Sequence, residues 1–92
     1  MDDINDHANE FIFFKIIQSG EIIKVSLSRS NLGKKFDDIY GLLLKGLKFK
    51  QKDTYISNEN GKMVGDLDLE LSLQEIIKKF GNKLKVYYEK IF

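Results

Sequence analysis

Residues 36–48 carry the feature that most constrains the fold, an apolar stripe at helical spacing. The stripe consists of Phe36, Ile39, Tyr40, Leu43 and Leu47. Because these residues recur at intervals of three and four, a helix places them on one face, which needs an apolar surface to cover it. The flanking segments have the pattern of strands, so the sequence predicts an α+β domain whose sheet packs on one central helix. Leu43→Ala is expected to lower the stability of such a domain by ~2–5 kcal/mol.

The segments on either side of this helix alternate as β-strands do. Residues 11–18 are β-branched and aromatic, residues 21–28 alternate, and the Ser-Gly connection between them predicts a hairpin. Residues 54–57 and 83–89 predict two further strands. Residues 65–71 also alternate, which predicts either a short edge strand or an extended connection. The sequence therefore predicts a sheet of four or five strands.

Capping residues mark the expected ends of the helices. The pair Ser30-Asn31 precedes the central helix and consists of two good N-cap types. Ser72 and Glu75 have the spacing of a capping box, and Gly81 suits a left-handed C-terminal cap, so residues 73–80 are predicted to form a short second helix. The predicted core consists of Ile12, Phe14, Ile16, Ile23, Val25, Leu27, Phe36, Ile39, Tyr40, Leu43, Leu47, Ile56, Leu73, Ile77, Leu84 and Val86.

Composition and charge bound the class of protein. With 42% hydrophobic and 12% aromatic residues, the 92-residue chain suits one folded domain. Residues 1–10 hold four of the 14 acidic residues and none of the 15 basic ones, so residues 11–92 carry a net charge of +5. We therefore expect residues 1–10 to form a flexible acidic arm and residues 11–92 to form the domain.

The sequence contains no apolar run of the ~18 residues that a membrane span needs. Its acidic start lacks the basic region of a signal peptide, and the chain has no cysteine. We therefore expect a cytoplasmic protein without disulfides or thiolate metal sites.

Residues that could carry catalysis or hold a metal ion are scarce. His7 is the single histidine and lies in the acidic arm, so no serine or threonine has a preorganised histidine base. Asp66, Asp68 and Glu70 would align on a strand, where a solvated edge is favoured over a cation site. The basic run at residues 45–52 suits a solvated helix end better than a nucleic-acid site. We expect no enzymatic activity, no cofactor, no metal and no nucleic-acid partner.

The closing part of the chain resembles the ubiquitin-like superfamily. The third predicted strand is followed by Gly61-Lys62, the short helix is preceded by Leu71-Ser72-Leu73, and the last strand opens with Gly81-Asn82-Lys83-Leu84-Lys85-Val86. This order is similar to the "Leu, short helix, Gly-x-x-Leu-x-Val" ending of ubiquitin-type proteins, and the resemblance covers residues 11–90. It implies the β-grasp fold, a mixed sheet of four or five strands wrapped on one central helix, with a short second helix.

Two branches of this superfamily are similar to separate parts of the chain. Residues 73–80 resemble the ubiquitin-fold modifier, and residues 28–44 resemble the YukD/EsaB proteins of type VII secretion. The resemblance implies a non-enzymatic module that binds a protein partner. A first alternative is a protein modifier that is conjugated through a C-terminal glycine, which the ending Glu89-Lys90-Ile91-Phe92 does not contain.

A second alternative is a Phox-and-Bem-type heterodimerisation domain. The segment from Tyr55 to Lys62, followed by the acidic residues at 66, 68 and 70, is similar to the acidic stretch of that family. Lys15 matches the lysine that the family carries on its first strand, whereas Lys62 stands where the family favours an acid. This alternative implies a head-to-tail contact between Lys15 and the acidic residues.

Alternation also predicts which residues contact a partner. Ubiquitin-like domains commonly bind through the outer face of the sheet, and here that face has an aromatic and aliphatic centre with lysines among it, which suits an acidic partner. We expect the domain to be a monomer or a weak homo-oligomer. The predicted partner-binding residues are Phe11, Phe13, Lys15, Ile17, Ile22, Lys24, Lys85 and Tyr87.

Overall fold

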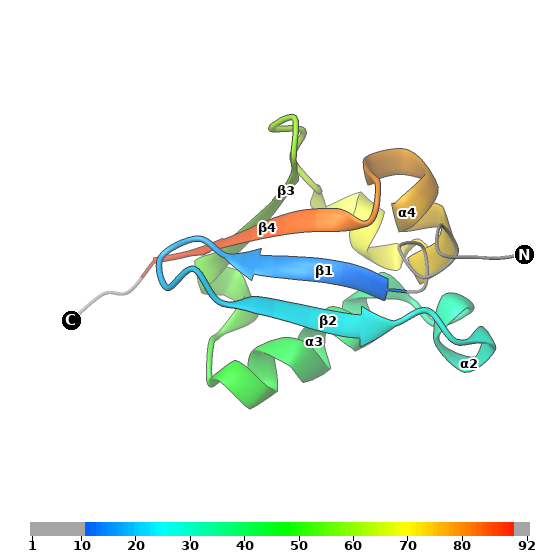
Figure 1. The fold of residues 1–92 in the computed structure, drawn as a ribbon, viewed down its shortest axis with the longest axis horizontal. Helices are drawn as coiled ribbons and strands as arrows, with labels where there is room; N and C mark the ends of the chain where they lie inside the picture. Colours follow the sequence, from blue (N-terminus) through cyan, green and yellow to red (C-terminus); the bar gives the residue numbers. More distant parts are fainter. Residues whose placement is uncertain (1–10, 90–92) are drawn as a thin grey trace, which may run out of the picture.

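The alternating segments of the chain form one mixed four-stranded sheet in the computed structural model, which describes residues 11–89 (Figure 1). The predicted acidic arm, residues 1–10, lies outside the described residues. The strands are β1 (Phe11–Ile16), β2 (Ile22–Ser26), β3 (Thr54–Asn58) and β4 (Lys83–Tyr88). The helices are α2 (Arg29–Leu32), α3 (Phe36–Leu47) and α4 (Leu73–Phe80), with 3-10 turns η1 (Gln51–Asp53) and η2 (Asp66–Glu70).

The strand order is β2-β1-β4-β3. β1 and β2 form the predicted hairpin, whose turn contains Gly20 at a φ of 77°, a conformation that glycine adopts without steric cost. β1 pairs in parallel with β4, and β3 pairs antiparallel with β4. The sheet therefore has β1 and β4 in its middle, and β2 and β3 at its edges.

The helices lie on one face of this sheet, where α3 runs behind the strands in the view of Figure 1. The core between sheet and helix contains a stack of three aromatic rings, with centroid distances of 5.7 Å between Phe36 and Tyr40 and 6.1 Å between Phe14 and Phe36. The buried apolar residues are Ile12, Phe14, Ile16, Phe36, Ile39, Tyr40, Leu44, Ile56, Leu73, Ile76, Phe80, Leu84 and Val86.

The predicted core is wrong in two respects. Leu44, Ile76 and Phe80 are buried although they were not expected in the core. The residues that are only half-buried, although predicted to be in the core, are Ile23, Val25, Leu27, Leu43, Leu47 and Ile77. For the residues of α3 and β2 the reason is that α3 turns Phe36, Tyr40 and Leu44 toward the middle of the sheet, so its other apolar row faces the edge strand β2, beside which no further described strand lies.

The two longer helices begin beside each other. Ser72 caps α4 by accepting a hydrogen bond from the Glu75 backbone N–H, and the Glu75 side chain accepts one from the Ser72 N–H, which confirms the capping box. A bridge between Lys35 and Ser72 joins the two helix starts. The expected N-cap pair Ser30-Asn31 instead lies inside the short helix α2, and Lys35 occupies the N-cap position of α3.

Residues 66–70 form the 3-10 turn η2, so the prediction of a strand or an extended connection there is wrong. The Asp68 carboxylate accepts a hydrogen bond from the Gly65 N–H at 2.9 Å, and the Asp68 N–H donates to the Gly65 carbonyl at 3.0 Å. These local bonds close the turn and leave Leu67 88% exposed. The described part of the chain therefore has four strands rather than five.

Candidate functional site

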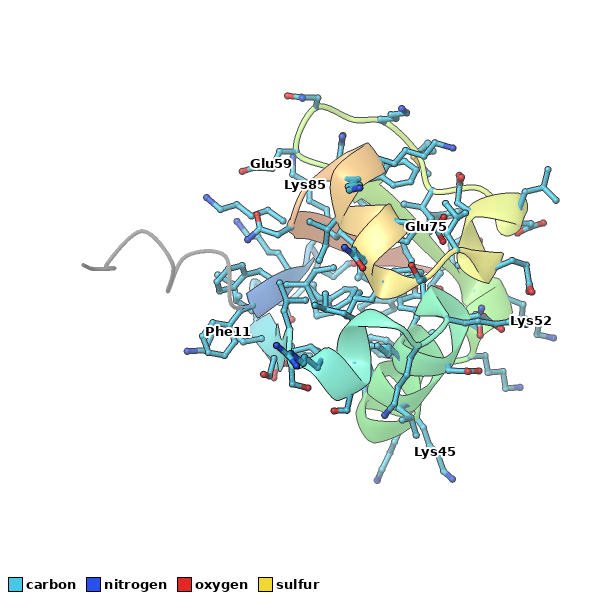
Figure 2. The ribbon with its side chains drawn as sticks, turned by 90° about the vertical axis from the view of Figure 1, so that its right-hand side faces the viewer. Phe11, Lys45, Lys52, Glu59, Glu75 and Lys85 are labelled. Carbon is cyan, nitrogen blue, oxygen red and sulfur yellow. The ribbon has the colours of Figure 1, made fainter. Side chains whose placement is uncertain are left out.

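The face of the sheet that is turned away from α3 is called the outer face below. On β1, Ile12, Phe14 and Ile16 are buried against the helices, so alternation places Phe11, Phe13 and Lys15 on the outer face. No described helix covers this face. Figure 2 shows Phe11, Glu59 and Lys85 on that side of the sheet, whereas Lys45 projects from the side of the helices.

The register of the three neighbouring strands brings the predicted site residues into rows. Lys15 pairs with Ile22 on β2 and with Lys85 on β4. Two residues earlier on β1, Phe13 pairs with Lys24 on β2 and with Lys83 on β4. Because directly opposed residues point to the same face, these six side chains form one continuous patch across the middle of the sheet.

Lys83 was missing from the predicted site although it has the same parity as Lys85 on β4, and that parity was available from the sequence. Tyr55 was missing for a different reason. It pairs with Tyr87 across β3 and β4 and is 49% exposed, but the pairing of these strands follows only from the sheet topology. Both residues therefore belong to the candidate site.

Two more predicted residues lie at the far end of the patch. The Ile17 N–H donates to the Val86 carbonyl at 2.9 Å, which continues the parallel ladder one residue beyond β1. This places Ile17, which is 36% exposed, beside Tyr87 in the row that ends at Tyr55. The structure thus brings all eight predicted site residues to one face.

At the opposite end of the patch, Phe11 packs beside Phe13 with their ring centroids 6.3 Å apart. The Lys24 ammonium lies 4.9 Å from the centroid of the Phe11 ring, a cation–π contact. Both rings are half-buried, so each keeps a part of its surface available to a partner.

The middle of the patch is hollowed into a shallow depression of about 330 Å³. Phe13 and Ile22 provide its apolar walls, and Lys15, Lys83 and Lys85 surround them. Glu59 is the one carboxylate that lines the depression. Within residues 11–89, the ion pairs are Lys35–Glu70 and Lys79–Asp68, so none of these three lysines is neutralised by a described carboxylate. The depression is therefore a positively charged site with an aromatic centre.

The acidic residues of η2 do not form the aligned row that a strand would have produced. The Asp68 carboxylate lies 2.6 Å from the Lys79 ammonium, and this hydrogen bond, with a second one from the Gly65 N–H, holds the pKa of Asp68 below its ordinary value. Glu70 accepts a hydrogen bond from the Lys35 ammonium at 3.1 Å. Two of the three carboxylates therefore already have partners within the chain, which weakens the argument for a heterodimerisation front.

The described residues hold no group of three or more His, Cys, Asp or Glu side chains that is placed to bind a metal ion. His7 lies outside them. Among residues 11–89, no helix has both the length and the apolar character to cross a membrane. Comparison of the sequence with protein-family models and with curated proteins finds no match.

Proposed function

We propose that this chain is a ubiquitin-like β-grasp domain that binds a partner protein through its outer face. The order β2-β1-β4-β3, with parallel first and last strands in the middle, supports the fold part of the proposal. The packing of α3 against one side of that sheet supports it further. This arrangement leaves the outer face of the sheet without a described covering helix.

The observation that carries the functional part is the combination of half-buried aromatic rings and unneutralised lysines on that face. Large exposed apolar patches are rare on small soluble domains and usually mark contact surfaces. Phe13 and Tyr87 are side chains of the kind that anchor interfaces. Three lysines surround the depression against one carboxylate, Glu59, so charge complementarity favours an acidic surface on the partner.

Phe13→Ala and Tyr87→Ala should each weaken partner binding by ~1 kcal/mol or more, which is about a fivefold rise in the dissociation constant. The reason is that each change removes an aromatic ring from the patch while the buried side of the sheet stays intact. The partner is first captured from a lysate of the native cells with the wild-type chain. Its dissociation constant is then measured by titration calorimetry with each variant, at low and at high salt.

Leu67→Ala is the matched control, because Leu67 is an 88% exposed apolar side chain on η2, outside the patch. It should leave the dissociation constant unchanged. Raised salt should weaken binding of the wild-type chain, since screening acts on exposed lysines. Equal binding by the wild type, Phe13→Ala and Tyr87→Ala would place the contact elsewhere on the domain, and unfolding of both variants would show that the two rings belong to the core.

A further inference from the structure

The two edges of the sheet differ in how their free backbone groups are satisfied. On β3, the Asn58 N–H donates to the Lys62 carbonyl at 2.9 Å, and the Ile56 carbonyl accepts from the Val64 N–H at 2.8 Å. The segment after β3 therefore covers that edge. β2 forms the other edge, and no described strand pairs with its free side, where the Asn31 side chain donates to the Ser26 carbonyl at 2.8 Å.

The pairing of β2 with β1 determines which of its backbone groups are free. The Ile16 N–H donates to the Glu21 carbonyl at 2.8 Å, so the odd-numbered residues of this strand direct their backbone groups toward β1. Ile22 and Lys24 consequently direct theirs away from the sheet. An unpaired edge of this kind is a template for a further strand.

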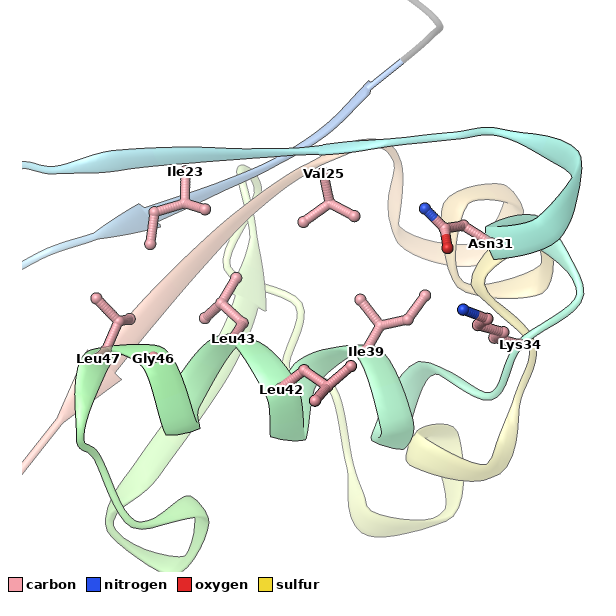
Figure 3. Close-up of a pocket in the computed structure, with 9 residues that line it drawn as sticks. All are labelled: Ile23, Val25, Asn31, Lys34, Ile39, Leu42, Leu43, Gly46 and Leu47. Atoms are coloured by element: carbon pink, nitrogen blue, oxygen red, sulfur yellow. The ribbon is translucent and has the colours of Figure 1, made fainter.

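An apolar groove of about 460 Å³ runs below this edge, between β2 and α3 (Figure 3). Ile23 and Val25 point into it from the strand, and Leu43 and Leu47 face them from the helix. All four are half-buried, which means that the groove holds apolar surface the domain itself does not cover. An occupant that adds a strand to β2 would bury this surface as well.

The surface beside the groove is complementary to itself. Leu42 projects from α3 with 70% of its side chain exposed. One helical turn further, Gly46 has no side chain and faces open space, since a Cβ atom built at that position has no neighbour within 4 Å. In a pair of antiparallel helices related by a two-fold axis, Leu42 of each copy fits over Gly46 of the other. A projecting side chain and a position without one, a helical turn apart on the same helix, suit an isologous interface.

The same axis gives β2 a compatible register. An axis through Ile23, which lies above the stretch of α3 between Leu43 and Leu47 in Figure 3, pairs Ile22 of one copy with Lys24 of the other. These are the residues with free backbone groups, and the register keeps the two Lys24 side chains from opposing each other. The Lys24 ammonium is also drawn onto the Phe11 ring on the outer face, so it does not obstruct the edge.

This register also brings opposite charges of the two copies, Glu21 and Lys34, toward each other. Glu21 of one copy comes to lie opposite Val25 of the other, on the helix side of the sheet, because it has the parity of Ile23 and Val25. Lys34 lines that end of the groove and has no ion pair among the described residues. Glu21 of each copy therefore faces Lys34 of the other, twice in the dimer.

We propose that two copies of this chain associate through the free edge of β2, with the groove between β2 and α3 filled by Leu42 of the partner copy. The product is a two-fold symmetric dimer with a continuous eight-stranded sheet. Its two outer faces lie side by side, so the dimer presents the binding patch twice and gains avidity for a partner with repeated acidic sites. β2 is a short strand of five residues, so we expect a reversible dimer.

Sedimentation equilibrium of the full 92-residue chain from micromolar to millimolar concentration tests the proposal. The wild type should show a monomer–dimer equilibrium. Leu42→Asp should raise its dissociation constant at least about tenfold, because it places a carboxylate in an apolar groove. Leu67→Asp makes the same change at an 88% exposed leucine on η2 and should leave the equilibrium unchanged. A wild-type chain that stays monomeric at every concentration would overturn the proposal. This holds also if its groove binds peptides of other proteins.

A charge exchange identifies the register. Glu21→Lys and Lys34→Glu should each weaken self-association, since each places like charges together twice. An equimolar mixture of the two variants should associate again, because only the mixed dimer pairs unlike charges at both sites. Failure of the mixture to associate would contradict the proposed register. Phe13→Ala, which alters the outer face alone, should leave the dimer intact. The dimer is therefore tested independently of the proposed function.

Discussion

Leu44→Ala should lower the free energy of unfolding by about 2–5 kcal/mol, a large part of the stability of a domain of this size. Leu44 is 2% exposed and lies in the row of α3 that faces the middle of the sheet. Truncating it removes apolar contacts and leaves a cavity that the aromatic stack of Phe14, Phe36 and Tyr40 cannot readily fill. Chemical denaturation followed by circular dichroism measures the change.

The two preceding leucines provide matched controls on the same helix. Leu42 is 70% exposed, so Leu42→Ala should change the free energy of unfolding by less than about 0.5 kcal/mol. Leu43 is half-buried at the groove, and its truncation should have an intermediate effect, smaller than the one expected from the helical stripe alone. A larger loss for Leu43→Ala than for Leu44→Ala would show that α3 is rotated relative to the sheet. The three variants are compared at micromolar concentration, where dimerisation contributes little.

Alkaline pH should destabilise the wild-type domain through Tyr40. Its hydroxyl is buried and donates to Thr54 Oγ1 at 2.6 Å, and burial raises the pKa of Tyr40 to about 12, although the hydrogen bond to Thr54 acts in the opposite direction. In the unfolded chain a tyrosine has a pKa of about 10. The stabilising contribution is therefore complete below pH ~10 and is lost as the pH rises toward 12. The loss amounts to roughly 2–3 kcal/mol.

Tyr40→Phe isolates this effect from the titration of the lysines and of the other tyrosines. At pH 7 the variant should be about 1 kcal/mol less stable than the wild type, because it lacks one hydrogen bond while Thr54 still donates to the Gln51 carbonyl. Between pH 10 and 12 the wild type should lose stability faster and the two curves should cross. If the free energies of unfolding of the wild type and of Tyr40→Phe changed in parallel between pH 10 and 12, the burial of the hydroxyl would be contradicted.

Local sequence patterns were sufficient to predict the structure wherever the interacting residues lie within a few positions of each other in the chain. Ser72 and Glu75 cap each other three residues apart, so the start of α4 was predictable from the sequence. Gly81 ends α4 where a glycine was expected and has a positive φ of 93°, but its ψ of −180° lies outside the left-handed helical conformation that was predicted. Alternation along β1 predicted its buried and its outer side chains, because the period of a strand does not depend on the neighbouring chain.

The same patterns gave wrong predictions where a segment is compatible with two local structures and contacts with distant segments decide between them. The alternation of residues 65–71 is compatible with a strand, but the Asp68 carboxylate closes a turn onto Gly65 and also binds Lys79 of α4. The apolar residues of α3 form two adjacent rows. The two rows are neighbours around the circumference of the helix and both belong to its apolar face. The sequence therefore does not indicate which of them faces the middle of the sheet.

The chain by itself determined the composition of the outer face, since parity along each strand follows from the order of its residues. The tertiary structure decided which strands are neighbours, and so placed Lys83 beside Phe13 and Tyr55 beside Tyr87. It also decided that β2 is an edge, which leaves Ile23 and Val25 half-buried above a groove. Burial depends on what lies across the sheet, and strands and helices far apart in the sequence provide those neighbours.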